Sequence, residues 1–143
     1  MESLMKYINH TSRCANLYRS AQMRGAGLKG CQHGYIFQVC RNPGISQEQL
    51  AKNLSVNKSS VTRQLSALEQ NGFVRRSPSE TDRRVLHVFP TEKALDILPQ
   101  VRALSKRWNE QVLADFTPAE RTLILSLMER VMQRAKTLAE PEV

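Results

Sequence analysis

Short hydroxyl side chains and long cationic ones alternate with apolar residues in the segment 57–68. Val61, Leu65 and Leu68 recur at i, i+4 and i+7, a spacing that predicts one buried face of an α-helix. The opposite face presents Lys58, Ser59, Thr62, Arg63 and Ser66. Side chains of this kind on an exposed helix suit phosphates and base edges, because an α-helix fits the major groove of duplex DNA.

We expect Arg63 to contact guanine, since its guanidinium can donate to O6 and N7 together. Lys58 suits either a base or a phosphate, and the hydroxyl groups suit phosphates or short base contacts. Gln64 belongs to the same set, although its position turns it toward the side of the helix. The residues of this helix expected to bind DNA are Asn57, Lys58, Ser59, Ser60, Thr62, Arg63 and Gln64.

Two short capped helices in succession would position this face. Ser46 followed by Gln49 is an S-x-x-Q capping box, which satisfies two backbone amides at the start of a helix. The buried face of that helix is expected to be Leu50, Ala51 and Leu54. After a connection at residues 55–56, Asn57 caps the second helix and Gly72 supplies its left-handed stop. Two helices joined by so short a turn indicate a helix-turn-helix.

The hydrophobic period changes from helical to extended after the second helix. Residues 73–77 and 84–89 are rich in β-branched and apolar side chains and flank a polar turn at 78–82. They predict a β-hairpin, the wing of a winged helix-turn-helix. Its cations are Arg75, Arg76, Arg83 and Arg84. We therefore expect the loop to be exposed and cationic.

Further helices are predicted on both sides of these elements. Residues 3–22 and 31–42 each carry an apolar stripe at helical spacing. Thr91 caps a long helix that runs to about Leu113, in which Pro99 should produce a kink. Its inward side is expected to be Leu95, Leu98, Val101, Leu104, Trp108 and Val112.

A last helix is predicted from Thr117-Pro118-Ala119-Glu120, which combines an N-cap, a proline at the first helical position and a capping-box glutamate. An apolar stripe follows, alternately four and three residues apart: Ile124, Met128, Val131, Ala135 and Leu138. This spacing is typical of a helix that pairs with another helix, and we expect it to pair with a second copy of the chain. The alternative is that the stripe packs inside its own domain.

The chain of 143 residues suits a single compact domain, with 41% hydrophobic and 24% charged residues, as in an ordinary globular protein. No apolar run is long enough to cross a membrane and the start lacks the apolar core of a secretory signal, so we expect a cytoplasmic protein with no membrane partner. The sequence has no glycine-rich phosphate loop, nucleophile motif or obvious carboxylate pair. This argues against an enzyme and against a bound cofactor.

The three cysteines, Cys14, Cys31 and Cys40, fit no paired spacing, so free thiols are expected rather than disulfides. We expect buried, inert thiols; the alternative is that Cys14, next to Arg13, senses oxidation. His10 lies four residues before Cys14, but no group of three or four ligands has the spacing of a metal site. We therefore expect no bound metal.

The net charge of +8 is distributed unevenly along the chain. Residues 1–44 carry six positive and one negative side chains and residues 57–90 carry six and three, whereas the other segments balance. The surplus at 57–90 coincides with the elements expected to meet DNA phosphates. Two alternatives stand beside this interpretation. A cationic helix face can be merely solvated, and a winged helix can serve protein–protein contact, which predicts a neutral face on the second helix.

The segment 32–94 resembles the core of the MarR family of regulators. The likeness is carried by PGISQEQLAKNL, by NKSSVTR at the start of the next helix, and by NGFVRR followed by DRR and a strand ending near Thr91. It implies a mainly α fold with a small β-hairpin wing: a MarR-like winged helix-turn-helix with an interlocked helical dimerisation region. The implied organisation is one domain over 1–143, with a DNA-binding lobe at 31–90 and dimerisation segments at 1–24 and 91–143.

The resemblance also implies a function. A homodimer would bind a pseudo-palindromic operator in double-stranded DNA as a sequence-specific transcription regulator, a repressor that a small molecule or oxidation releases. Asp82-Arg83-Arg84 matches the family's D-x-R pattern, in which the aspartate orients the second arginine toward the minor groove. We therefore expect Arg84 to enter that groove, Asp82 to brace it and Arg83 to meet a phosphate.

The same resemblance suggests an effector pocket between the helical dimerisation region and the DNA-binding lobe. A small anionic or aromatic effector is the expected ligand, with Arg13 and His33 as its candidate contacts. The alternative is that Arg13 is solvated and that His33 is a packing histidine with its hydrogen bonds satisfied.

Overall fold

The computed structural model describes residues 3–141 and is mainly helical, with one small antiparallel sheet. The chain divides inside its long fifth helix into two compact units, Met1–Ser105 and Lys106–Val143. No helix within residues 3–141 is long and apolar enough to cross a membrane. The predicted mainly α fold with a small hairpin is confirmed, whereas the division into a DNA-binding lobe and dimerisation segments stays a prediction.

The predicted helix-turn-helix forms within unit Met1–Ser105. Helix α3 (Gln47–Leu54) is capped by Ser46, whose hydroxyl accepts a hydrogen bond from the Gln49 amide at 3.1 Å. Only this half of the predicted capping box forms, because the Gln49 side chain donates to Asn53 Oδ1 at 2.7 Å instead of returning to Ser46. Residues four apart are neighbours on a helix surface, which makes Asn53 an accessible acceptor.

Helix α4 (Lys58–Gln70) begins and ends at the predicted signals. Asn57 Oδ1 accepts a first-turn amide at 2.8 Å. At the other end Gly72 has φ +80°, and the Phe73 amide donates back to the Leu68 carbonyl at 2.9 Å. A left-handed residue with this return bond satisfies the last carbonyls of the helix and turns the chain toward the wing.

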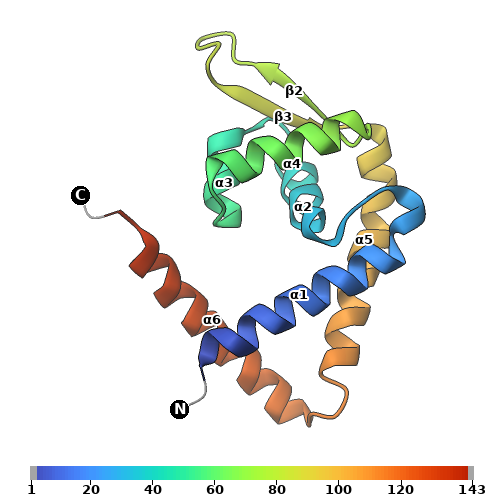
Figure 1. Ribbon diagram of the computed structural model, residues 1–143, viewed down its shortest axis with the longest axis vertical. Coiled ribbons are helices and arrows are strands. Elements are labelled where there is room, and N and C mark those ends of the chain that lie inside the picture. Colours follow the sequence, from blue (N-terminus) through green and yellow to red (C-terminus); the bar gives the residue numbers. More distant parts are fainter. Residues whose placement is uncertain (1–2, 142–143) are drawn as a thin grey trace. The chain divides into compact units, whose positions relative to one another are not determined.

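The wing strands β2 (Val74–Pro78) and β3 (Leu86–Pro90) pair antiparallel, so the predicted hairpin is confirmed. A third strand, β1 (Ile45–Ser46), pairs with the other edge of β3, which gives the order β1-β3-β2. The sequence did not predict it, because two residues are too short to show an alternating period. In Figure 1 the hairpin runs alongside α4, and its loop projects away from the helices.

The core of this unit lies among α2 (His33–Arg41), α3, α4, the sheet and α5 (Glu92–Val112). Its fully buried side chains include Ile36, Leu50, Leu65, Phe73 and Val101. The three inward positions predicted for α4 are all buried. Their burial fixes the rotation of α4 and therefore the face that it turns outward.

Helix α5 departs from the prediction at both ends. Thr91 caps it, since its hydroxyl accepts the Ala94 amide at 3.3 Å, and Pro99 lies inside the helix without ending it. Leu95 is 48% exposed and Val112 is 44% exposed, so the prediction that these two residues point inward is wrong. The buried residues are Ala94, Val101 and Leu104. The Thr91 hydroxyl also bonds carbonyls of the turn after α4, and this close approach suits a small inward side chain. The kink at Pro99 stays a prediction.

Helix α1 (Leu4–Gln22) is followed by two 3₁₀ turns, η1 (Arg24–Ala26) and η2 (Gly30–Gln32), and then by α2. The η2 turn packs against α1, where the Gly30 amide donates to Ser20 Oγ at 2.8 Å. Both predicted N-terminal helices are therefore confirmed.

In unit Lys106–Val143, helix α6 (Pro118–Ala139) begins with the complete capping box predicted for it. The Thr117 amide donates to Glu120 Oε1 at 2.9 Å, and the Glu120 amide donates to Thr117 Oγ1 at 3.2 Å. No residue of α6 is buried. The residues of its predicted apolar stripe are exposed or half-buried.

The prediction of buried thiols is wrong for two of the three cysteines. Cys14 on α1 and Cys31 in η2 are exposed, and Cys40 on α2 is half-buried; all three are free. The neighbouring residues Ala15 and Gln32 occupy the buried positions of these two segments, which leaves the cysteines on the outside.

Candidate nucleic-acid interface

The outward face of α4 carries the predicted contacts. Lys58, Ser59, Thr62 and Arg63 are exposed and Ser60 is half-buried. This face is cationic rather than neutral and is not covered by the chain, which favours nucleic acid over a neutral protein-contact surface.

Hydrogen bonds within the helix refine what its hydroxyl groups can do. Thr62 Oγ1 donates to the Lys58 carbonyl at 3.0 Å, and Ser66 Oγ donates to the Thr62 carbonyl at 2.8 Å. A hydroxyl has only one proton, so each is left as an acceptor in this arrangement. The amino groups of adenine or cytosine then suit Thr62 better than a phosphate does.

Two other predicted contacts on α4 are engaged by the protein itself. Asn57 Oδ1 is used by the cap, which leaves the side-chain NH₂ group as the part that could donate to DNA. Gln64 is half-buried, and its Oε1 accepts from Gln32 Nε2 at 3.1 Å. Because Gln32 is buried in η2, this bond draws Gln64 back toward its own domain and makes it a weaker candidate than Arg63.

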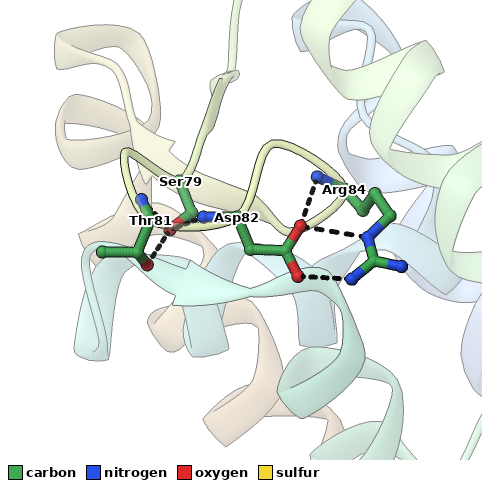
Figure 2. A network of polar contacts seen from close by, with 4 residues as sticks. All are labelled: Ser79, Thr81, Asp82 and Arg84. Atoms are coloured by element: carbon green, nitrogen blue, oxygen red, sulfur yellow. Dashed lines mark hydrogen bonds and ion pairs between the residues drawn. The ribbon is translucent and has the colours of Figure 1, made fainter.

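At the wing tip, Asp82 holds Arg84 (Figure 2). Asp82 Oδ1 accepts from the Arg84 amide at 3.0 Å and from its Nε at 3.1 Å, and Oδ2 accepts from Nη2 at 3.2 Å. These bonds from the Arg84 side chain and amide lower the pKa of the Asp82 carboxyl below its usual range. The Arg84 side chain is nevertheless 92% exposed. The brace predicted from the D-x-R pattern thus exists as a contact, and its role in DNA binding stays a prediction.

Short hydrogen bonds shape the loop that carries this pair. The Ser79 amide donates to the Val85 carbonyl at 2.8 Å, and the Val85 amide donates to the Asp82 carbonyl at 3.0 Å. Ser79 Oγ also lies 3.1 Å from Thr81 Oγ1 (Figure 2). Arg83 is exposed in the same loop, as a phosphate contact would require.

The α4 face and the wing border one hollow of about 220 Å³. It is lined by Gln47, Glu48, Lys58, Val61, Thr62, Arg84, Val85 and Leu86. Arg84 therefore lies on the same side of the molecule as the start of α4. One duplex could meet both elements, which is the arrangement that reading two grooves requires.

The other two wing arginines are less available than the sequence suggested. Arg75 stacks on the Phe89 ring, with its guanidinium carbon 4.3 Å from the ring centre. The Arg76 side chain is only 16% exposed and forms a salt bridge with Glu69 at 3.1 Å. The sequence did not predict this pairing, because the two residues belong to different elements and no local spacing links them.

The two candidate effector contacts occupy different environments. Arg13 is exposed on α1, whereas His33 is 1% exposed at the start of α2, and neither residue lines the hollow at the wing. Neither ring nitrogen of His33 has a hydrogen-bond partner among the residues that the structure describes. Burial, together with the positive charge of Arg19, lowers the pKa of His33 to about 4. His33 is thus buried with its ring nitrogens unpaired by the described residues, unlike the satisfied packing histidine of the alternative, and its role as an effector contact stays a prediction.

No group of three or more residues in the described part of the chain could hold a metal ion.

Residues 32–86 match the sequence model of the MarR family. The chain is 29% identical over 131 residues to the uncharacterized HTH-type transcriptional regulator YybA of Bacillus subtilis (strain 168), with 92% of this chain and 87% of that protein covered. Its fold is similar to a MarR transcriptional regulator from Methanosarcina mazei Go1, with a TM-score of 0.88, 26% identity, and 94% and 97% of the two chains covered.

The fold also matches that of a MarR family regulator from Listeria monocytogenes solved with a 26mer DNA, with a TM-score of 0.85. That alignment covers 100% of this chain and 99% of the other at 21% identity, so it shows the fold alone. These relatives are transcription regulators rather than enzymes, in keeping with the lack of catalytic motifs in the sequence. Residues 32–86 therefore match the MarR family, and the chain as a whole is similar to winged helix-turn-helix transcription regulators.

Proposed function

We propose that this regulator recognises a specific sequence in double-stranded DNA and represses transcription there. The observation that carries the proposal is that the exposed cationic face of α4 and the braced, exposed Arg84 border the same hollow. The Listeria protein of the same fold is solved with a 26mer DNA, which supports the same kind of ligand for this chain.

In this proposal α4 enters the major groove. Arg63 donates to guanine O6 and N7, Lys58 meets a base or a phosphate, and Ser59 and Ser60 bind the backbone near the helix start. Arg84 enters the neighbouring minor groove, where a narrow groove has a deeper negative potential. Base preference comes mainly from α4, and the wing adds affinity with little discrimination between bases.

The regulator is proposed to act as a homodimer. No residue of α6 is buried, and burying its apolar stripe against a second copy removes apolar surface from water. A two-fold dimer presents two copies of α4 to two half-sites about one helical turn apart, so its operator is pseudo-palindromic.

We propose that the regulator is released from DNA when a small anionic or aromatic effector binds to it, or when one of its thiols is oxidised. Arg13 is exposed and could supply the charge for an anion, whereas His33, the second predicted contact, is buried in this structure. Cys14 and Cys31 are exposed thiols that a cytoplasmic oxidant could reach. We propose the cytoplasm as the place of action, since that is where bacterial-type operators are found.

The test of DNA binding begins with selection of a duplex from a random pool. The affinity of the selected duplex is then measured by fluorescence anisotropy over a salt series. DNA binding through several phosphates predicts a steep loss of affinity as salt rises, with log Kd linear in log salt. Binding that no duplex sequence improves, or that salt leaves unchanged, would reject the proposal in favour of a protein-contact module.

A further inference from the structure

Arg76 in strand β2 joins three elements of the candidate interface. Its Nη1 donates to Gln47 Oε1 of α3 at 3.1 Å, and its Nη2 donates to Ser66 Oγ and Glu69 Oε1 of α4, both at 3.1 Å. The Arg76 amide also donates to Glu69 Oε2 at 3.0 Å. With its side chain 16% exposed, this guanidinium faces the protein rather than the solvent side, where a phosphate would lie.

Each of these bonds leads to a part of the surface proposed to meet DNA. The Ser66 hydroxyl donates onward to the α4 backbone one turn earlier, at 2.8 Å. Gln47 lines the hollow together with Arg84. On the other side, the register pairs Arg76 with Val88 of β3, the strand that begins two residues after Arg84.

The chemistry of the side chain fits this role. A guanidinium offers five donors in a rigid planar fork, whereas a lysine ammonium is a point charge on a flexible stem. Only the fork can hold Gln47, Ser66 and Glu69 in a fixed mutual arrangement. An unheld hairpin would have to be ordered on binding, and that ordering reduces affinity.

We propose that Arg76 is a positioning residue, which fixes the wing against α4 so that Arg63 and Arg84 reach their grooves in one DNA half-site together. This inference rests on the proposed function, because it assigns Arg76 a role only in DNA binding. Arg76 itself does not touch the DNA.

The substitution Glu69→Ala distinguishes positioning by Arg76 from a simple effect of net charge on DNA affinity. The hydrogen bond from the Arg76 side chain lowers the pKa of Glu69, so this carboxylate is ionised at neutral pH. The substitution Glu69→Ala removes a negative charge and would tighten DNA binding if only the overall field mattered. If positioning matters, the same substitution weakens binding.

The experiment measures the affinity of the full-length protein for the selected duplex at one salt concentration. The variants are Arg76→Met, Glu69→Ala, Arg84→Ala and the combinations of each of the first two with Arg84→Ala. Arg75→Met is the matched control, since it removes the same charge from the adjacent residue of the same strand. Thermal melting of every variant reports separately on stability.

We expect Arg76→Met to weaken binding about tenfold, and Arg75→Met only about twofold. Once Arg84 is absent, Arg76→Met should change the affinity by less than about threefold, because the side chain that it positions is gone. A merely structural role for Arg76 would lower the melting temperature without this coupling to Arg84.

The inference is overturned if the effects of Arg76→Met and Arg84→Ala simply multiply, if Arg75→Met weakens binding as much, or if Glu69→Ala tightens it. Should Arg76→Met fail to fold, the cycle of Glu69→Ala with Arg84→Ala decides the question, since Glu69 is an exposed residue of the last turn of α4. Failure of the wild-type protein to bind any duplex would reject the proposed function instead, so the two failures are distinguishable.

Discussion

Gly30 lies directly against the backbone of Asn16, so that the η2 turn and helix α1 meet without a side chain between them. A Cβ at Gly30 would lie 2.2 Å from the Asn16 carbonyl oxygen, a distance that no relaxed structure allows. The absence of a side chain at Gly30 therefore lets α1 pack on the segment that leads into the helix-turn-helix.

The substitution Gly30→Ala should accordingly destabilise the protein. We expect a loss of about 2–3 kcal/mol in the free energy of unfolding, because the backbone of α1 must move away from the turn. Urea denaturation followed by circular dichroism measures it. Gly25→Ala is the matched control, since a Cβ there meets no atom within 4 Å. Equal stabilities for the two variants would contradict the packing described.

His33 predicts an acid-sensitive stability. Its pKa is about 4 in the folded chain, against 6.5 for the ordinary group, so the unfolded chain binds more protons between these values. Stability from this residue is fully present above pH 6.5 and is lost as the pH falls toward 4. The loss amounts to about 3 kcal/mol.

The variant His33→Phe should remove this part of the pH dependence, because a phenyl ring has no charge to bury. The measurement is the free energy of unfolding at several pH values between 7 and 4. The matched control is His10→Gln, which changes an exposed histidine. A slope unchanged in His33→Phe would show that other groups govern acid stability.

The substitutions Arg63→Ala and Arg84→Ala should change DNA binding in different ways. We expect Arg63→Ala to lose the preference for guanine at the contacted position and about 1–3 kcal/mol of binding free energy. Arg84→Ala should weaken binding to all sequences alike, since a minor-groove arginine discriminates little between bases. Footprinting on random duplexes compares the two variants with the wild type. Identical footprints from all three proteins would discard this assignment of roles.

A charge on the α6 stripe should separate the proposed dimer. Met128→Glu places a carboxylate at an exposed position of the stripe. Because a charge is costly to bury at an interface, we expect the dissociation constant of the proposed dimer to rise by at least about tenfold. Sedimentation equilibrium measures it. Gln133→Glu adds the same charge to an exposed position off the stripe and should leave the mass unchanged. A monomeric wild type would remove the basis for two half-sites.

Sequence reasoning succeeded where neighbours along the chain decide the structure. The caps at Asn57 and Thr117 and the left-handed Gly72 are signals contained within a few residues, and each appears where it was predicted. The rotation of α4 followed from the same kind of signal, because three apolar residues at helical spacing have only one way to face a core.

It failed where the deciding partner lies far away in the chain. Arg76 and Gln47 are 29 residues apart, and Gln64 and Gln32 are 32 apart, so no local pattern relates them. The two-residue strand β1 exists only because β3 lies beside it. At the start of α5, Ala94 rather than Leu95 faces the core, because Thr91 holds this end of the helix against the turn after α4. Helical spacing alone does not encode that contact.

The exposed apolar stripe of α6 has a consequence for how fast the protein is degraded in a cell. Until the proposed dimer forms, a newly synthesised chain would present the exposed apolar stripe of α6 to solvent, and proteases and chaperones act on such segments. Degradation would then be fastest when the protein is scarce. The amount of regulator already present would thus help to determine how long each new molecule survives.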